Sequence, residues 1–315
     1  MKKILVSGCA GFIGSNLVDK LLKNKWRVVG VDNFNDYYDP KIKRENLIEA
    51  SKSKYFKLYC ADAIDFEQMK QIFSREKPDV VVHLAARAGV RPSLDNPLLY
   101  GEVNKLGTLN LLKLSVDFKI SKFVFASSSS VYGKSKIIPF FEDDPCLDII
   151  SPYGASKRAA EIFVETFSKV YGLKTVALRL FTVYGPRGRP DMAPALFTNA
   201  VREGRAVNQF GDGKTFRDYT FVDDIVEGIE KAIEMDMNFE IINLGNNNPV
   251  SLLEFISVIE TALGKKAKVL KVPLRPGDVK KTWANVEKAR DLLGWSPKTN
   301  ISQGIKEYIK WLKQV

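Results

Sequence analysis

Cysteine, histidine and long apolar runs are all scarce in this chain of 315 residues, which has one histidine and three cysteines. Cys9, Cys60 and Cys146 are scattered, and none stands in CxxC spacing. An odd number of dispersed cysteines disfavours both a disulfide framework and a zinc site. We therefore expect no bound metal and a reducing, cytoplasmic location.

Apolar runs are short throughout. No run approaches the roughly 18 apolar residues that a membrane helix needs. The first apolar run, residues 4–6, reaches Gly8 too soon for a signal peptide. Hydrophobic residues make up 45% and charged residues 27%, which is typical of globular proteins and excludes disorder. We predict a globular protein with no membrane association.

Positive charge exceeds negative charge, with 48 Lys and Arg against 37 Asp and Glu, a formal net charge of +11. The lysines are spread along the whole chain, and their densest runs are short. This pattern predicts a solvated, lysine-rich surface that would suit an anionic small ligand. It disfavours a nucleic-acid partner, which needs a concentrated basic face.

Apolar strands alternate with helical patterns in the first half of the chain, which predicts a parallel sheet with helices on both faces. Beyond residue 181 the pattern loosens and predicts mainly short helices. The predicted strands are 3–7, 27–31, 55–60, 79–84, 122–126 and 175–180. The predicted helices are 13–24, 104–117, 152–171, 193–203, 224–233, 252–263 and 301–312.

A glycine-rich turn follows the first predicted strand. Gly8, Gly11 and Gly14 stand in GxxGxxG spacing, which lets the backbone approach a pyrophosphate at the positive end of a helix. Asp32 ends the second strand 18 residues after Gly14, where a carboxylate binds ribose hydroxyls and repels a 2′-phosphate. The combination predicts a site that prefers NAD to NADP. Asp62, after the third strand, is a candidate contact to the adenine amine.

A tyrosine and a lysine share one face of the predicted helix 152–171. Tyr153 and Lys157 are four residues apart, so both can face one ligand. A tyrosine with a pKa of about 10 is a weak base at neutral pH, and a neighbouring ammonium lowers that pKa. Four serines, residues 127–130, follow the strand 122–126, at the edge where α/β proteins form their sites.

Together with His83-Leu84-Ala85-Ala86 and residues 179–186, these motifs resemble the extended short-chain dehydrogenase/reductase family over essentially the whole chain. The resemblance implies an α/β, Rossmann-type doubly wound parallel sheet with a smaller C-terminal substrate-binding domain. The NAD-binding domain would comprise residues 1–181, with 222–245 returning to it, and residues 182–315 would mainly bind a nucleotide sugar. The resemblance further implies a homodimer built through the helices near 104–117 and 152–171.

The resemblance also implies roles for individual residues. Ser128, Tyr153 and Lys157 would form the catalytic triad, and His83 would be structural or line the cofactor. The expected NAD-binding residues are Gly8, Gly11, Phe12, Ile13, Gly14, Asp32, Asn33, Asp62, Ala63, Leu84, Ala85, Ala86, Tyr153 and Lys157. The expected substrate-binding residues are Arg91, Ser128, Ser129, Ser130, Thr182, Arg189, Arg217, Arg275 and Asp278.

The serine run bears on the reaction. Dehydratases of this family carry Thr-Asp-Glu at positions 128–130, and UDP-glucuronate decarboxylases carry Glu at position 130. The resemblance therefore favours a 4-epimerase, in which Tyr153 acts as the one base and a 4-keto sugar takes its hydride back. Residues 33–40, 88–91 and 188–193, with Thr182, resemble UDP-glucuronate 4-epimerases. UDP-glucose 4-epimerase and UDP-glucuronate decarboxylase remain alternatives.

The proposed uronate substrate agrees with the chemistry of these side chains. Hydroxyls and the Arg189 guanidinium suit a C6 carboxylate. By resemblance, Arg217 and Arg275 would face the diphosphate of a UDP-sugar, and Asp278 would accept a bond from its ribose.

Overall fold

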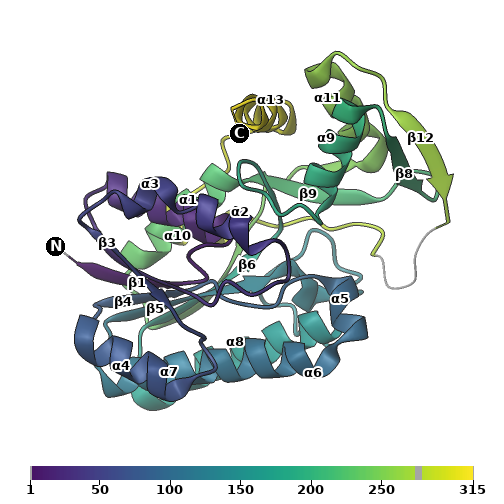
Figure 1. Cartoon of the computed structure of the whole chain (residues 1–315). Coiled ribbons are helices and arrows are strands. Elements are labelled where there is room, and N and C mark those ends of the chain that lie inside the picture. Colours follow the sequence, from purple (N-terminus) through teal and green to yellow (C-terminus); the bar gives the residue numbers. More distant parts are fainter. Residues whose placement is uncertain (1, 274–278, 315) are drawn as a thin grey trace.

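Seven parallel strands form the central sheet of the molecule, in the order β10-β6-β5-β4-β1-β2-β3 (Figure 1). The structure is a computed structural model that describes residues 2–273 and 279–314. The strands of this sheet are β1 (Lys3–Ser7), β2 (Arg27–Asp32), β3 (Phe56–Cys60), β4 (Val80–His83), β5 (Lys122–Ser128), β6 (Thr175–Leu180) and β10 (Phe239–Leu244).

Helices cover both faces of this sheet because its strands are apolar on both sides. In β1, Ile4 and Val6 pack with the hydrophobic cluster on one face, and Leu5 packs with the cluster on the other. Figure 1 shows α1 and α10 on the first face and α4, α7 and α8 on the second. These helices are α1 (Phe12–Lys23), α4 (Phe66–Glu76), α7 (Gly107–Asp117), α8 (Pro152–Tyr171) and α10 (Val222–Glu234). The predicted α/β doubly wound fold is confirmed.

Shorter helical segments connect the main elements. The α-helix predicted from residue 104 begins instead at Gly107, because a π-helical turn precedes it. The segments are α2 (Pro40–Glu45), α3 (Ile48–Ser51), α5 (Val90–Asp95), α6 (Pro97–Tyr100), the π-helical turn η1 (Gly101–Leu106), the 3-10 turn η2 (Ser129–Tyr132) and α12 (Glu287–Leu293). None of the helices in the described part of the chain is long and apolar enough to span a membrane.

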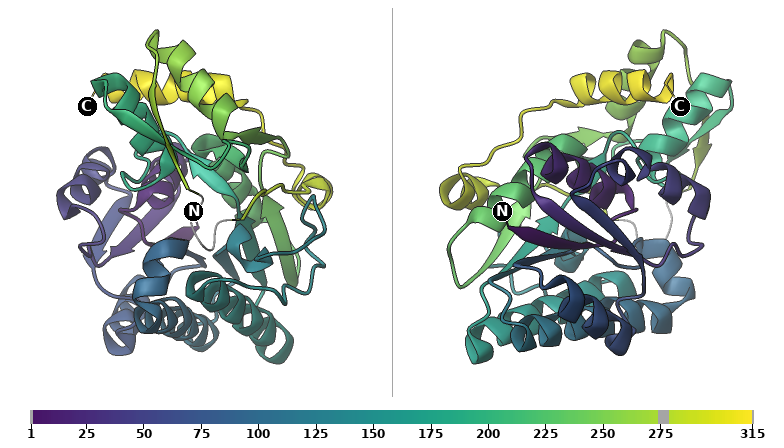
Figure 2. Two further views of the ribbon diagram at one scale, coloured as in Figure 1. Left: turned by 90° about the vertical axis from the view of Figure 1, so that its right-hand side faces the viewer. Right: turned by 60° about the vertical axis from the view of Figure 1, so that its left-hand side comes forward.

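A smaller assembly lies on the α1 side of the central sheet, away from α8, as Figures 1 and 2 show. Its three helices were predicted, whereas its five strands were not, because two of them have only three residues and the other three mix charged or amide residues with apolar ones. They pair as β11-β9-β7 and β12-β8. The elements are β7 (Thr182–Tyr184), α9 (Ala193–Glu203), β8 (Ala206–Phe210), β9 (Phe216–Phe221), β11 (Pro249–Ser251), α11 (Leu252–Leu263), β12 (Lys268–Val272) and α13 (Ile301–Leu312).

The strand order reverses between β4 and β1, and this position is where open α/β sheets bind ligands. All seven strands are parallel, so their carboxyl ends meet at one edge. Helix α8 begins close to this edge, at Ser151, whose hydroxyl oxygen accepts a 3.0 Å hydrogen bond from the Gly154 N–H. The cap fixes where the helix starts and therefore where Tyr153 points.

His83, at the end of β4, is buried and serves the fold. Its Nδ1 lies 2.7 Å from Ser7 Oγ, and its Nε2 lies 3.0 Å from Thr108 Oγ1. The Thr108 hydroxyl donates to the Asn104 carbonyl, so it accepts from Nε2–H and the imidazole is neutral. Burial, together with the charge of Lys157, lowers the pKa of His83 to about 3. The side chain therefore bridges β1, β4 and α7.

Stability should consequently fall as the pH drops below about 6.5, the usual pKa of an unfolded histidine. At pH 5 the unfolded chain binds a proton on His83 that the folded chain does not. We expect the free energy of unfolding to fall by about 1.2 kcal/mol from pH 6 to 5. Urea unfolding at several pH values measures this slope, and His83→Asn should remove most of it. Because the chain has one histidine, its NMR titration gives an independent check, and a native pKa near 6.5 would contradict the account.

Candidate functional site

A cavity of about 910 Å³ opens over the carboxyl ends of β1, β2, β4 and β5 and extends beneath β8 and β9. Every predicted site residue that the structure describes lines this cavity. Arg275 and Asp278, the remaining two, lie outside the described residues. Segments separated by more than two hundred residues thus contribute to one hollow.

The glycine turn is closely packed. Gly8 has φ +72°, and a Cβ there would lie 2.7 Å from the Ala85 nitrogen. A Cβ on Gly14 would overlap the Gly8 carbonyl oxygen. The turn therefore tolerates no side chain at either position, and it leaves an open cradle at the N-terminus of α1. An anionic group placed there meets the positive end of a twelve-residue helix.

Asp32 holds this turn in place. Its Oδ2 accepts a 3.0 Å hydrogen bond from the Ala10 N–H, and its Oδ1 accepts a 2.9 Å bond from the Phe34 N–H. Burial raises the pKa of the carboxyl, although these backbone donors favour its charged form. Beside it, the Asn33 amide donates to Asp62 at 2.6 Å. The ends of β2 and β3 thus present a prearranged polar surface to the cavity.

The serine run turns away from the end of β5. Ser128 Oγ accepts from the Ser130 N–H at 3.1 Å and lies 3.2 Å from Ser130 Oγ, which folds η2 back toward the cavity. Ser127 points to the other side, where its hydroxyl donates to Glu161 at 2.6 Å. Three of the four serines, at positions 128–130, therefore line the cavity with hydroxyls, and Ser127 also borders it while fastening β5 to α8.

Tyr153 and Lys157 both line the cavity, as their spacing on α8 predicts. Burial raises the pKa of Tyr153, while a hydrogen bond with Ser128 and the charge of Arg189 act in the opposite direction. Lys157 Nζ donates to the Ala126 carbonyl at 2.7 Å, and burial lowers its pKa to about 7. Arg189 is one cation whose charge favours a Tyr153 phenolate.

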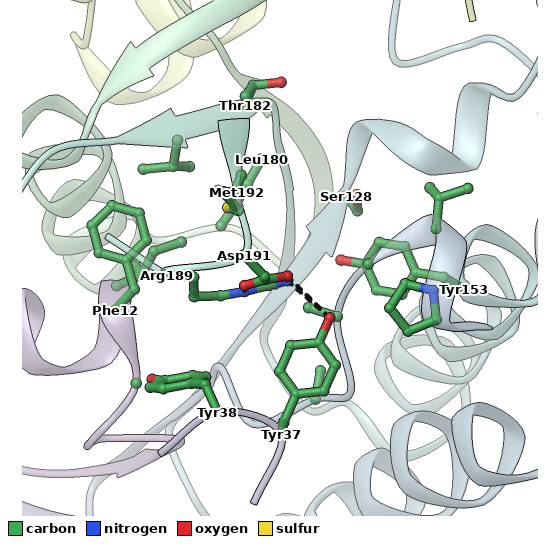
Figure 3. A pocket seen from close by; sticks show the side chains of 18 of the residues that line it. Phe12, Tyr37, Tyr38, Ser128, Tyr153, Leu180, Thr182, Arg189, Asp191 and Met192 are labelled. Atoms are coloured by element: carbon green, nitrogen blue, oxygen red, sulfur yellow. Dashed lines mark hydrogen bonds and ion pairs between the residues drawn. The ribbon is translucent and has the colours of Figure 1, made fainter. Parts of the chain in front are cut away.

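Arg189 lies in the cavity with its charge already paired. Its Nε donates to Asp191 Oδ1 at 3.0 Å, its Nη2 to Asp191 Oδ2 at 2.5 Å, and the same Nη2 to Tyr37 Oη at 3.1 Å. Figure 3 shows this group between Phe12 and Tyr153. The sequence predicted Arg189 as a site residue but did not predict its partners. Asp191 lies two residues further along the chain, and Tyr37 lies in a separate loop.

Several lining residues were not predicted. Tyr37, Tyr38 and Asp191 fall inside segments that were noted only as motifs. Lys43, whose Nζ donates to the Asn35 carbonyl at 2.7 Å, stands in no motif. On and around β8 the missed residues are Arg205, Asn208 and Phe210. These residues line the cavity only because β8 folds over it, and no pattern in the neighbouring sequence predicts this placement.

The chain is similar in sequence and structure to known proteins. A family model described as GDP-mannose 4,6 dehydratase matches residues 5–308. The chain belongs to this family. The expected resemblance to the extended short-chain dehydrogenases/reductases is confirmed.

Several known proteins are similar to the chain over almost its whole length. A UDP-glucuronate 4-epimerase of Thermodesulfobacterium geofontis is 45% identical over 312 residues, covering 98% of this chain and 96% of that protein. A solved UDP-glucuronic acid 4-epimerase of Bacillus cereus, in complex with UDP-glucuronic acid and NAD, is 36% identical with a TM-score of 0.91 and covers 99% of both chains. A UDP-glucose 4-epimerase of Thermotoga maritima, solved with UDP-glucose, has the same identity, coverage and TM-score.

Proposed function

We propose that this chain is an NAD-dependent epimerase that interconverts UDP-glucuronate and UDP-galacturonate at C4 through a 4-keto sugar. The observation that carries this proposal is the set of acids in the cavity. Among the described lining residues only Asp32, Asp62 and Asp191 are carboxylates; the first two follow β2 and β3, and the third pairs with Arg189. Elimination of water needs an acid and a base beside the sugar, whereas epimerisation needs one base.

The glycine turn and Asp32 fit the cofactor. The cradle at the N-terminus of α1 suits a pyrophosphate, and the Asp32 carboxylate suits the hydroxyls of an adenine-side ribose. NAD, when bound, supplies the acceptor for the hydride of C4 and gives the hydride back. Bound NAD would be held by the residues that the sequence predicts, with Asn33 and Asp62 meeting the adenosine.

Tyr153 is the proposed base for the sugar O4. Its hydroxyl interacts with Ser128 and lies in the field of Arg189, and both favour the phenolate over the neutral phenol. Lys157, held by the Ala126 carbonyl, sits one helical turn further along the same face of α8. Its buried ammonium would position the cofactor ribose and Tyr153 together. A single base then removes the O4 proton and later returns it to the other epimer.

A C6 carboxylate has suitable partners in the same cavity. We propose that the hydroxyls of Ser128, Ser129, Ser130 and Thr182 and the guanidinium of Arg189 bind it. The 4-keto intermediate of a uronate is a β-keto acid, which loses CO2 when the carboxylate bond aligns with the carbonyl π system. Hydrogen bonds that hold the carboxylate out of this alignment would prevent that loss.

The far end of the cavity is the proposed diphosphate site. Arg217, on β9, lines it, and Arg91, on α5, lines it from the opposite lobe. Guanidinium groups suit phosphate geometry, so both are proposed to contact the UDP-sugar. The assignments of Arg275 to the diphosphate and Asp278 to the ribose remain predictions from sequence. The proposed division of labour is a cofactor domain of residues 1–181 with 222–245 and a substrate domain in the rest.

We also propose a homodimer and a cytoplasmic location. Apolar side chains are exposed near α8: Leu98 in α6 is 87% exposed and Ile162 in α8 is 50% exposed. A second copy would bury them, and light scattering in solution measures the assembly. Cys9, Cys60 and Cys146 are all free thiols, which agrees with a reducing compartment.

A panel of UDP-sugars tests the proposed activity. Purified protein with NAD is incubated separately with UDP-glucuronate and UDP-glucose, and the sugar protons are followed by NMR. We expect UDP-glucuronate to give UDP-galacturonate. Conversion of UDP-glucose but not of UDP-glucuronate would contradict the proposed binding of the C6 carboxylate. Accumulation of a UDP-pentose would show decarboxylation instead of epimerisation.

A further inference from the structure

The carboxylate of Asp191 already holds Arg189 in the way a ligand carboxylate would. Both oxygens of Asp191 accept from the guanidinium, on its Nε and Nη2 edge, at 3.0 and 2.5 Å. This two-bond geometry is the strongest that arginine makes with a carboxylate. The Tyr37 hydroxyl closes the group by donating to Asp191 Oδ2 at 3.2 Å and accepting from Arg189 Nη2 (Figure 3).

The two charges differ in their access to water. The Arg189 side chain is 16% exposed, whereas the Asp191 side chain is 43% exposed. Arg189 also faces Tyr153 closely enough for its charge to affect the pKa of that tyrosine. Both side chains line the cavity, and the carboxylate is the more exposed of the two. Asp191 regains hydration easily if it leaves the pair, while Arg189 keeps its place and requires an anion.

The turn that carries both residues is closed by a backbone hydrogen bond. Asp191 precedes α9, and the Met192 N–H donates to the Arg189 carbonyl at 3.2 Å, which keeps the two side chains on one turn. Tyr37 reaches the pair from the segment after β2. The cation–ring distance of 5.0 Å between Arg189 and Tyr37 adds a contact that does not depend on Asp191. Arg189 can thus stay in position when Asp191 is exchanged for another anion.

We propose that Asp191 is the resident counter-ion of Arg189 and competes with the carboxylate of the sugar for it. This inference rests on the proposed function, in which Arg189 meets a uronate. A uronate replaces the bonds and the charge that Asp191 provides, whereas a neutral hexose offers no anion and leaves the pair intact. Asp191 is therefore a specificity-determining residue: it weakens the binding of the uronate in the ground state and thereby eases release of the product.

Asp191→Asn tests the competition, because asparagine keeps the size and one acceptor but removes the charge. Binding is measured by calorimetry on the NAD-loaded protein, with Tyr153→Phe in the background so that the ligand is not converted. We expect Asp191→Asn to lower the Kd of UDP-glucuronate by roughly tenfold and to leave the Kd of UDP-glucose within about twofold. Asp95→Asn, an exposed acid in α5 outside the cavity, is the control for a change of net charge.

The double variant Arg189→Gln/Asp191→Asn completes the test. Without the guanidinium, removing Asp191 should no longer favour UDP-glucuronate over UDP-glucose. An unchanged or raised Kd for UDP-glucuronate in Asp191→Asn would overturn the inference, since it would mean that Asp191 orients Arg189 for the ligand. That result leaves the proposed function intact if the unmodified protein still epimerises UDP-glucuronate. Failure of the unmodified protein to act on UDP-glucuronate would instead remove the proposed function.

Discussion

Tyr153→Phe is expected to lower kcat on UDP-glucuronate by about 10²–10⁴-fold, the usual contribution of a general base. The phenol oxygen is the only atom removed, and it is the one that interacts with Ser128 and lies in the field of Arg189. The ring still packs edge-on against Tyr100, with centroids 6.1 Å apart, so the start of α8 should be unchanged. NMR assays of the sugar measure the loss of turnover.

Two controls separate loss of the base from loss of the site. The variant should retain bound NAD, as seen by absorbance after denaturation, and the affinity for UDP should stay within about twofold. Tyr100→Phe is the matched substitution, because it removes a phenol oxygen of a residue outside the cavity lining, which donates to the Ala88 carbonyl at 2.8 Å and also interacts with Tyr37. Turnover by Tyr153→Phe at a rate near that of the unmodified chain would remove Tyr153 from the mechanism.

Glu161→Ala is expected to destabilise the fold by about 3–5 kcal/mol, because it leaves a buried arginine without its counter-ion. Arg179 and Glu161 are 1% and 0% exposed, and they meet through two bonds of 2.9 and 3.0 Å. Ser127 also donates to Glu161, so the substitution frees a hydroxyl as well. The free energy of unfolding in urea, compared with that of the unmodified chain, measures the effect.

The double variant Glu161→Leu/Arg179→Met is the control. It removes both charges and fills most of their volume, so it should be markedly more stable than Glu161→Ala. The two residues join α8 to β6, and Ser127 extends the connection to β5. Equal stability of the single and the double variant would show that the ion pair is not what holds these elements together.

Local signals in the sequence were sufficient for six of the seven strands of the central sheet, and the Ser151 cap and the glycines of the first turn act on their immediate neighbours. No strand was predicted at β10, whose apolar residues are interrupted by Glu240 and Asn243. The helix expected from residue 104 was misplaced because the π-helical turn η1 has no distinctive composition. In the smaller assembly β7 and β11 are too short for periodicity, and β8 pairs with β12 across about sixty residues of sequence.

Cavity residues that stand in sequence motifs could be predicted. Those that reach the cavity only through tertiary contacts could not. Tyr153, Lys157 and Asp32 were found because their spacing carries chemical meaning. Arg189 meets Asp191 within one turn, but its contact with Tyr37 depends on how two loops approach each other, which no pattern within either loop encodes. That Lys157 lowers the pKa of Tyr153 stays a prediction, whereas its bond to the Ala126 carbonyl is set by the packing of α8 on β5, which no spacing in the sequence encodes.

The central claim is that one base and a returned hydride convert UDP-glucuronate at C4. UDP-glucuronate carrying deuterium at C4 tests it most directly, with the product examined by NMR after incubation in ordinary water. We predict UDP-galacturonate that keeps its deuterium at C4, because the hydrogen leaves and returns without exchange. Loss of the label to water, a labelled UDP-pentose, or no conversion alongside active conversion of UDP-glucose would contradict the account.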